Sequence, residues 1–503
     1  MNNLKRPLWI RAGWPGLGSA AALCALVGCQ SYERAPLNLA EHRSAFSSRL
    51  DNTEAIERFA ERLGQQDEAV AERFDPTDGL TQAEGEVLAL FYNADLRIAR
   101  LDAGVALATF ETAGLWEDPE FGFDGAEILS PAGPFEYGLT LSVTIPVSGR
   151  LGVEKDRAGA AYEAELRRIV DAEWRTRAQV RSAWAAWSAA SERLRLLREV
   201  VGQVERVASI TDRLESAGEL TRVEARLLRV ELVETRADIA QAELDEASAK
   251  IRLLGLLGLS PDSPVELVLA FSGVRDADVD MSVDRLIEAN TLLAVRRAQY
   301  QVAEESLRLE IREQYPDITL GTGFGSEDGD DRLLLGLSIP IPVLNANRAG
   351  IADAMAKRDV ARVAAETTLE RLTQELALAR ASFDAARTQR EAFERDLVPM
   401  LDEQSSEVER LADLGEVNTL ILLETVTRRF EAKSRLLDLR LAELRAAIEI
   451  TRLLGPEEAV SLAPAVSPAP IDAQTDNTPH NTTDSSAADD APAEPRHENE
   501  ASR

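Results

Sequence analysis

Two segments of the chain alternate between apolar and polar residues. In segment 135–145 every odd-numbered residue is apolar, and every residue between them is small or polar. Segment 333–341 has Leu or Ile at every odd-numbered position. A period of two places alternate side chains on the same face of a β-strand. Each segment therefore predicts a strand that is apolar on one face and mostly small or polar on the other.

Each of these strands has a predicted partner just before it. We expect one pair of strands at about 119–129 and 135–146, and a second pair at about 316–326 and 332–342. The short segments between the paired strands are rich in Pro, Gly, Ser and Asp, which favour turns. The sequence thus predicts two β-hairpins and four strands in one chain.

Long helices flank the hairpins. A helix of about 30 residues is expected before each one, at about 81–116 and at about 283–314. The segment from Gly152 to Ala217 contains no proline and predicts one helix of about 100 Å. Its apolar residues recur at steps of three, four and seven, the spacing of a coiled-coil seam: Trp187, Leu194, Leu197, Val201, Val204 and Ala208. We expect a reversal at Gly218 and an antiparallel partner helix from Thr221 to Leu257.

The same order of elements occurs twice. Asn93 and Pro119 recur as Asn290 and Pro316, 197 residues later in both cases. Further matches follow in the same order: LSVTIPV at 141–147 with LSIPIPV at 337–343, LESAGEL at 214–220 with LADLGEV at 411–417, and Leu-Leu-Gly at 253–255 with 453–455. A fixed order at nearly constant spacing indicates a tandem duplication. The predicted repeats are 85–259 and 283–455, joined by a linker at 260–282.

A bend is expected in the second long helix at Pro399, since proline interrupts helical hydrogen bonding. Gly202 stands 197 residues earlier. Two helix-weakening residues at one register predict a bend in both copies.

The N-terminus has the features of a secretory signal. Basic residues precede an apolar run, and the run ends in Leu-Val-Gly-Cys at 26–29. This ending resembles the bacterial lipoprotein box, which implies a signal peptide at 1–28, a lipid on Cys29 and an outer-membrane address from Gln30. The alternative is an ordinary signal peptide with an incidental cysteine. An N-terminal segment at 29–84 follows the signal, and the polar residues 456–503 predict a disordered tail.

Composition agrees with this architecture. Hydrophobic residues make up 45% and aromatic residues 5% of the chain, a mixture typical of long helices and coiled coils. The net charge of -31 argues against nucleic acid as a partner. The histidines are scattered at 42, 480 and 497, so we predict no metal centre, no cofactor other than the lipid, and no catalysis.

The strands raise the question of a membrane. No segment after the signal has 18 continuous apolar residues, so a chain that crosses a membrane would use a closed β-barrel. Such a barrel needs at least about eight strands, so four strands per chain require an oligomer. Two chains would supply eight strands and three would supply twelve. The alternative is a water-soluble α/β protein with two edge hairpins on a helical bundle.

Taken together, these features resemble the TolC family of outer-membrane efflux proteins. The match covers about 85–455: the duplicated halves, the strand pairs, the strand-ending Ile-Pro-Val, the tip glycines and the closing Leu-Leu-Gly. The resemblance implies a mainly α-helical fold with a membrane β-barrel portion. It implies a homotrimer with a twelve-stranded barrel in the outer membrane of a Gram-negative bacterium and an α-helical periplasmic tunnel. The implied partners are a periplasmic adaptor protein, outer-membrane lipid and an inner-membrane transporter of the RND type.

The resemblance also implies site residues. The periplasmic tips, where an adaptor would dock, correspond to Arg213, Leu214, Gly218 and Glu219 and to Arg410, Leu411, Gly415 and Glu416. Some members narrow the entrance with carboxylates six and nine residues after the second tip glycine. Here those positions hold Ile421 and Glu424, so only Glu424 carries over as an entrance gate.

Two functions remain open at this point. The first is a passive exit duct for small molecules or metal ions, driven by an inner-membrane pump through the adaptor. The second is a periplasmic coiled-coil structural lipoprotein that forms no channel. Detergent dependence after removal of the lipid separates them.

Overall fold

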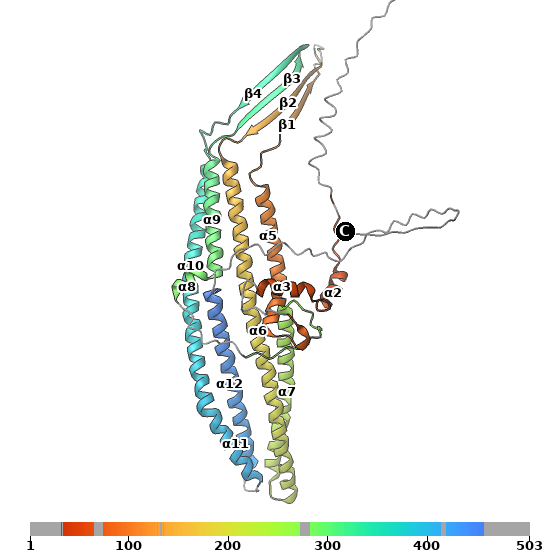
Figure 1. The fold of residues 1–503 in the computed structure, drawn as a ribbon, viewed down its shortest axis with the longest axis vertical. Helices are drawn as coiled ribbons and strands as arrows, with labels where there is room; N and C mark the ends of the chain where they lie inside the picture. Colours follow the sequence, from red (N-terminus) through yellow and green to blue (C-terminus); the bar gives the residue numbers. More distant parts are fainter. Residues whose placement is uncertain are drawn as a thin grey trace, which may run out of the picture.

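The computed structural model describes residues 32, 34–64, 74–127, 129–130, 133, 135–271, 282–413 and 419–456. Long helices run lengthwise, a β-sheet lies at one end, and the turn between α6 and α7 lies at the other (Figure 1). Cys29, Gly415, Glu416 and the C-terminal tail lie outside the described residues. None of the helices in the described part is both long and apolar enough to span a membrane.

The elements repeat in the order that the sequence predicts. The N-terminal segment holds α2 (Leu39–Ser47), α3 (Glu54–Gly64) and a 3-10 turn (Pro76–Asp78). The first repeat comprises α4 (Gln82–Tyr92), α5 (Ala94–Thr112), β1 (Glu120–Ala126), β2 (Glu136–Ile145), α6 (Arg150–Ala217) and α7 (Arg222–Leu256). The second comprises α8 (Val283–Ala289), α9 (Thr291–Arg312), β3 (Ile318–Glu327), β4 (Asp330–Ser338), α10 (Arg348–Ala392), a π-helical turn (Phe393–Leu397), α11 (Val398–Asp413) and α12 (Thr419–Leu454).

The helix predicted before each hairpin is two helices, and this expectation was wrong. The chain breaks at Asn93 and at Asn290, each of which caps the following helix. The Asn290 side chain accepts from the N–H of Leu293 at 2.9 Å and donates to the carbonyl of Leu453 at 2.8 Å. Asn93 likewise accepts from Asp95 and Leu96, and it donates to the carbonyl of Leu256 at 3.3 Å. One asparagine in each repeat thus caps one helix and ties it to the end of another.

These ties correct the predicted match of the Leu-Leu-Gly motifs. The equivalent of Leu453-Leu454-Gly455 is Leu256-Leu257-Gly258, at the same spacing of 197 as Asn93 and Asn290, and not 253–255. Gly258 and Gly455 both have positive φ, 71° and 74°, whereas Gly255 lies within α7. A Cβ on Gly455 would lie 2.0 Å from the carbonyl oxygen of Ala289, so the close approach requires glycine.

The strands form one antiparallel sheet in the order β1-β2-β3-β4. The predicted strand positions are confirmed, with shifted ends. β4 starts two residues earlier than expected and ends at Ser338 rather than at about 342. Pro340 and Pro342 explain the early end, because proline has no N–H to donate to a neighbouring strand.

The long helices differ between the repeats. α6 is one α-helix of 68 residues and passes through Gly202 without interruption. A bend was expected at Gly202, but the α-helical hydrogen bonding does not change there. In the second repeat a π-helical turn immediately precedes Val398-Pro399. The repeat spacing is 196 at the Leu-Ser-x-x-Ile-Pro-Val motifs and 197 at the tip glycines. The segment between strand and helix is longer in the second repeat, since the left-handed helix caps Gly149 and Asn347 lie 198 residues apart.

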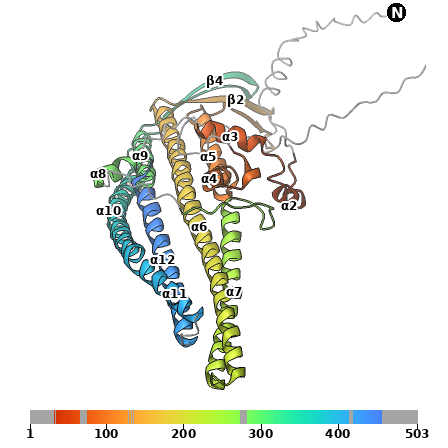
Figure 2. The same ribbon diagram turned by 60° about the horizontal axis from the view of Figure 1, so that its bottom comes forward.

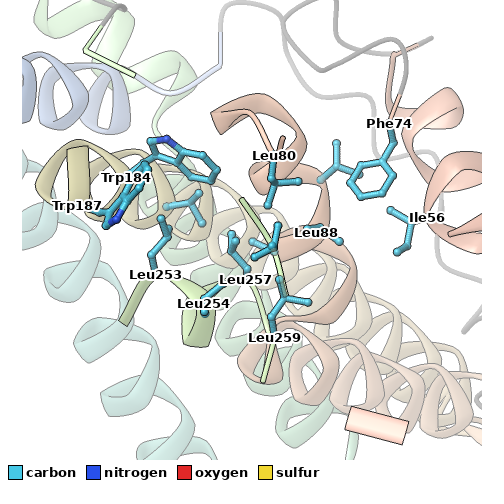
Figure 3. Close-up of a cluster of buried hydrophobic side chains, with 14 of the residues drawn as sticks. Ile56, Phe74, Leu80, Leu88, Trp184, Trp187, Leu253, Leu254, Leu257 and Leu259 are labelled. Atoms are coloured by element: carbon cyan, nitrogen blue, oxygen red, sulfur yellow. The ribbon is translucent and has the colours of Figure 1, made fainter. Parts of the chain in front are cut away.

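A buried core lies midway along the molecule. α3 and α4 of the N-terminal part pack there against α6 and α7, with Trp184 fully buried at the centre (Figure 3). The Trp184 indole donates to the carbonyl of Val268 at 2.9 Å, which holds the segment after α7 against the core. Gly85 on α4 faces this ring, and a Cβ there would lie 2.5 Å from it.

A charged junction joins the sheet to the helices. Arg150, at the start of α6, donates to Asp317 at 2.7 Å and to Glu117 at 2.8 Å. Asp317 immediately precedes β3, whereas Glu117 belongs to the segment before β1. Arg150 therefore connects the two repeats at the point where the sheet meets the helices.

The asparagine ties should contribute to stability. Replacement of the buried Asn290 by Ala removes a helix cap and leaves the Leu453 carbonyl without its partner, which we expect to cost about 2 kcal/mol. Asn290→Ser keeps an oxygen for the cap and should lose less. Urea unfolding of the detergent-extracted protein measures both variants. Equal stability of Asn290→Ala and wild type would contradict the role of the tie.

Candidate functional site: the sheet and the hairpin tips

One face of the sheet is apolar and uncovered in the single chain. The strand register places side chains of all four strands on it, and the larger ones are exposed: Phe121, Phe123, Leu139, Leu141, Leu320, Phe324, Leu333, Leu335 and Leu337. Leu335 is 81% exposed and Phe121 is 70% exposed. A continuous apolar face of this kind marks a surface that contacts lipid or another protein.

The opposite face is mostly small and polar, apart from Arg332 and Leu334 of β4. Thr140 pairs with Gly122 and Gly323, Ser142 pairs with Gly321, and Gly138 pairs with Gly325. A Cβ on Gly325 would lie 2.4 Å from the carbonyl oxygen of Tyr137. Glycine therefore lets the backbones approach closely, and this face carries no bulky side chain in the middle of β2 and β3.

The sheet has two free edges. β1 pairs with β2, and β4 pairs with β3, so among the described residues β1 and β4 each have one strand neighbour. The N–H and C=O groups along the outer sides of these strands are available for pairing with another chain.

The first hairpin tip is the reversal between α6 and α7. Gly218 has φ 77°, and the N–H of Glu219 donates to the carbonyl of Leu214 at 2.9 Å. This closes α6 with the left-handed turn that the sequence predicted at Gly218. Arg213, Gly218 and Glu219 are exposed, while Leu214 is half-buried.

Thr221 and Glu224, which the sequence interpretation missed, stabilise the return. The Thr221 hydroxyl accepts from the N–H of Glu224, and the Glu224 carboxylate accepts from the Thr221 N–H at 3.0 Å. The Thr221 hydroxyl and N–H lower the pKa of Glu224 by hydrogen bonding to its charged form. The spacing Thr-x-x-Glu before a helix is a capping box and was the available signal. Arg229 adds ion pairs to Asp212 and Glu215, both at 2.7 Å, across the hairpin.

The second tip is described on both sides of its turn. Arg410 and Leu411 are exposed near the end of α11. On α12, Glu424 is exposed and pairs with Arg428 at 2.7 Å, one helical turn further on. Glu424 is therefore a surface carboxylate about two turns from the start of α12, and its charge is partly matched within the same helix.

The described residues contain no group of three or more His, Cys, Asp or Glu side chains that could hold a metal ion. The functional features of the single chain are thus surfaces: the apolar sheet face, the two free edges and the two helical tips.

Comparison with known proteins agrees with this geometry. The model of the family described as "Outer membrane efflux protein" matches residues 88–259 and 283–456. The chain belongs to this family. The two matched ranges coincide with the two structural repeats and leave the N-terminal helices outside.

Individual relatives of this efflux protein are distant in sequence. It is 22% identical over 317 residues to the cobalt-zinc-cadmium resistance protein CzcC of Cupriavidus metallidurans, a match over 63% of this chain and 76% of the relative. Among solved structures, CusC has a TM-score of 0.63 at 20% identity, covering 74% of this chain and 92% of CusC. The outer-membrane channel OprN has a TM-score of 0.66 at 17% identity, covering 77% and 94%.

Family membership decides between the two functions left open by the sequence. The efflux protein is the outer-membrane channel of a tripartite efflux system of Gram-negative bacteria, with a helical part in the periplasm, and it is not an enzyme. Channels of this family form trimers within such systems. The predicted mainly helical, duplicated fold with four strands per chain is confirmed.

Proposed function

We propose that three copies of this chain close into one duct. Four strands from each copy would form a twelve-stranded barrel in the outer membrane, and the helices would continue it as a periplasmic tunnel. The observation that carries this proposal is the sheet: its apolar face is uncovered, its other face is small and polar, and both edges are free. In lipid an open edge leaves backbone groups without partners, so β4 of one copy pairs with β1 of the next.

Cys29 is the proposed lipid attachment site and holds the N-terminus at the outer membrane. A lipidated cysteine anchors a chain to the membrane surface but does not span the membrane. The lipid is therefore an anchor for the N-terminal segment, and the sheet is the element that keeps the protein in the membrane.

The tips are the proposed docking site for a periplasmic adaptor protein. Arg213, Leu214, Gly218 and Glu219 would form one contact, and Arg410, Leu411, Gly415 and Glu416 the other. The capping box and the Arg229 ion pairs favour this role, because they hold the first tip in a fixed shape before a partner binds. An inner-membrane transporter of the RND type, joined through the adaptor, would supply the energy.

Divalent metal cations are the proposed cargo. The similarity to a cobalt-zinc-cadmium resistance protein favours them over organic compounds. The net charge of -31 is consistent with a duct whose field attracts cations.

The cargo is tested by deletion of this chain in its host. We expect several-fold lower tolerance of Co2+, Zn2+ and Cd2+ and unchanged tolerance of hydrophobic antibiotics, because the exit of metal ions alone would be blocked. Wild-type protein supplied in trans is the control. Sensitivity to antibiotics without sensitivity to metals would overturn the metal assignment.

Glu424 is the proposed entrance gate, with one carboxylate from each copy. Its pairing with Arg428 is exposed, and exposed pairs are weak, so the carboxylate still contributes to the local field. Glu424→Gln should lower the cation-to-anion permeability ratio of the channel about twofold, because a ring of charge acts on ions within about a Debye length.

Reversal potentials in planar bilayers under a salt gradient measure this ratio. Glu163→Gln is the matched control, since Glu163 forms the same kind of one-turn pair with Arg167 at 2.9 Å but lies far from the tips. A reversal potential that Glu424→Gln leaves at the wild-type value would remove Glu424 from the gate.

A further inference from the structure

Equivalent helices of the two repeats have different neighbours in the single chain. α9 lies between α6 and α10, whereas its first-repeat equivalent α5 packs mainly on α6. α12 packs against α10, α11 and α6, whereas its equivalent α7 packs mainly along α6. Figures 1 and 2 show α7 and α10 at opposite edges of the helical layer. In the single chain, α7 of the first repeat therefore has a helix neighbour on one side, whereas α12 of the second repeat has helix neighbours on both sides.

A stripe of arginines marks this uncovered side of α7. Six residues at steps of four and three are all exposed: Arg222, Arg226, Arg229, Val233, Arg236 and Ala240, here called the arginine stripe. The equivalent residues of α12 are all buried or half-buried: Thr419, Leu423, Val426, Phe430, Lys433 and Leu437. Because the two helices are copies, the contrast shows which face of α7 is missing a partner.

The cover of α12 identifies that partner by equivalence. Val426, Phe430 and Lys433 line a small cavity together with Glu199 and Gln203 of α6. At the spacing of 197, Glu199 corresponds to Asp396 and Gln203 to Met400. Asp396, Met400, Glu403 and Glu407 follow one another at steps of four and three around the start of α11 and are all exposed, and we call them the acidic face. Met400, the apolar member of this face, is 63% exposed.

We propose that the arginine stripe of α7 docks against the acidic face of α11 in a second copy of this chain. The inference rests on the trimer proposed above and assigns the seam that closes its periplasmic end. The charges of the two faces are complementary. The cavity inside one chain has the same arrangement, with a cation on α12 (Lys433) and a carboxylate on α6 (Glu199). These two residues are equivalent to Arg236 and Asp396. The two helices run antiparallel, which places Val233 opposite Met400.

The arginines near the tip are available for this contact. Arg229 and Arg236 already pair within the chain, with Asp212 and Glu205 respectively, both at 2.7 Å. Arg222 and Arg226 have no carboxylate partner among the described residues. With Val233 opposite Met400, antiparallel packing places Glu407 of a second copy opposite Arg226. Glu407 would supply a partner to the Arg226 guanidinium group, and the attraction orients the copies as they meet.

Disulfide trapping tests the contact. The sequence contains two cysteines, at 24 and 29, so introduced thiols have little competition. On mild oxidation we expect Val233→Cys combined with Met400→Cys to give dimers and trimers on non-reducing gels. Gln203→Cys with Phe430→Cys, the equivalent pair inside one chain, should react without a gain in mass, and each single variant should give no cross-linked ladder.

Charge reversal tests the electrostatic part. Arg226→Glu should slow the inter-chain cross-link several-fold, because it would face Glu407 as a like charge. Addition of Glu407→Arg should restore the rate, and Arg213→Glu, outside the stripe, should leave it unchanged. An unchanged rate, or one that the swap does not restore, would overturn the charge assignment.

Native mass spectrometry of the same samples separates the two proposals. A trimer that gives no Val233–Met400 cross-link would overturn the seam and leave the duct in place. A protein that forms no trimer would overturn the duct itself.

Discussion

The free edges of the sheet are the constraint on which the rest of the molecule depends. β1 and β4 each present a row of backbone donors and acceptors, and the face beside them is apolar and uncovered. Water can satisfy the edges but disfavours the face, whereas lipid favours the face and leaves the edges unsatisfied. Both demands are met together when copies join edge to edge. Arg150 then fixes the start of α6 relative to the sheet, since its ion pairs are with segments that precede β1 and β3.

The two repeats give each chain two similar halves that can lie side by side in a ring. Small differences between the repeats make the two halves distinct. Asn93 and Asn290 hold the same bonds in both copies, so the middle of the molecule is closely repeated. Below it, α6 continues through Gly202 as one α-helix, while the second repeat has a π-helical turn before Pro399. The charges diverge as well: the outer face of α7 carries arginines at positions where its equivalent α12 carries mainly apolar residues, and α11 carries exposed carboxylates. Unlike faces allow neighbouring copies to interlock, which like faces would oppose.

Much of the fold could be predicted from local patterns, because strand alternation and the proline-free coiled-coil run are visible in single segments. The breaks at Asn93 and Asn290 could not, since their cause is a carbonyl 163 residues away in each case. The Leu-Leu-Gly match failed because two such runs adjoin at 253–258. The spacing of 197 selects Gly258 over Gly255, and the positive φ of Gly258 agrees. Pro399 predicted a bend but not its π-helical form. At the tips, the reversal at Gly218 could be predicted from the sequence, whereas the Glu424–Arg428 ion pair depends on side-chain placement.

The most direct test of the duct is the mass and shape of the detergent-extracted protein, by native mass spectrometry with negative-stain imaging, for wild type and Cys29→Ala. We expect a trimeric cylinder with helices of about 100 Å. The cylinder should still require detergent when the lipid is absent, because the sheet, not the anchor, contacts the membrane. A water-soluble monomer or dimer from Cys29→Ala would contradict the account, since the apolar sheet face would then not face lipid.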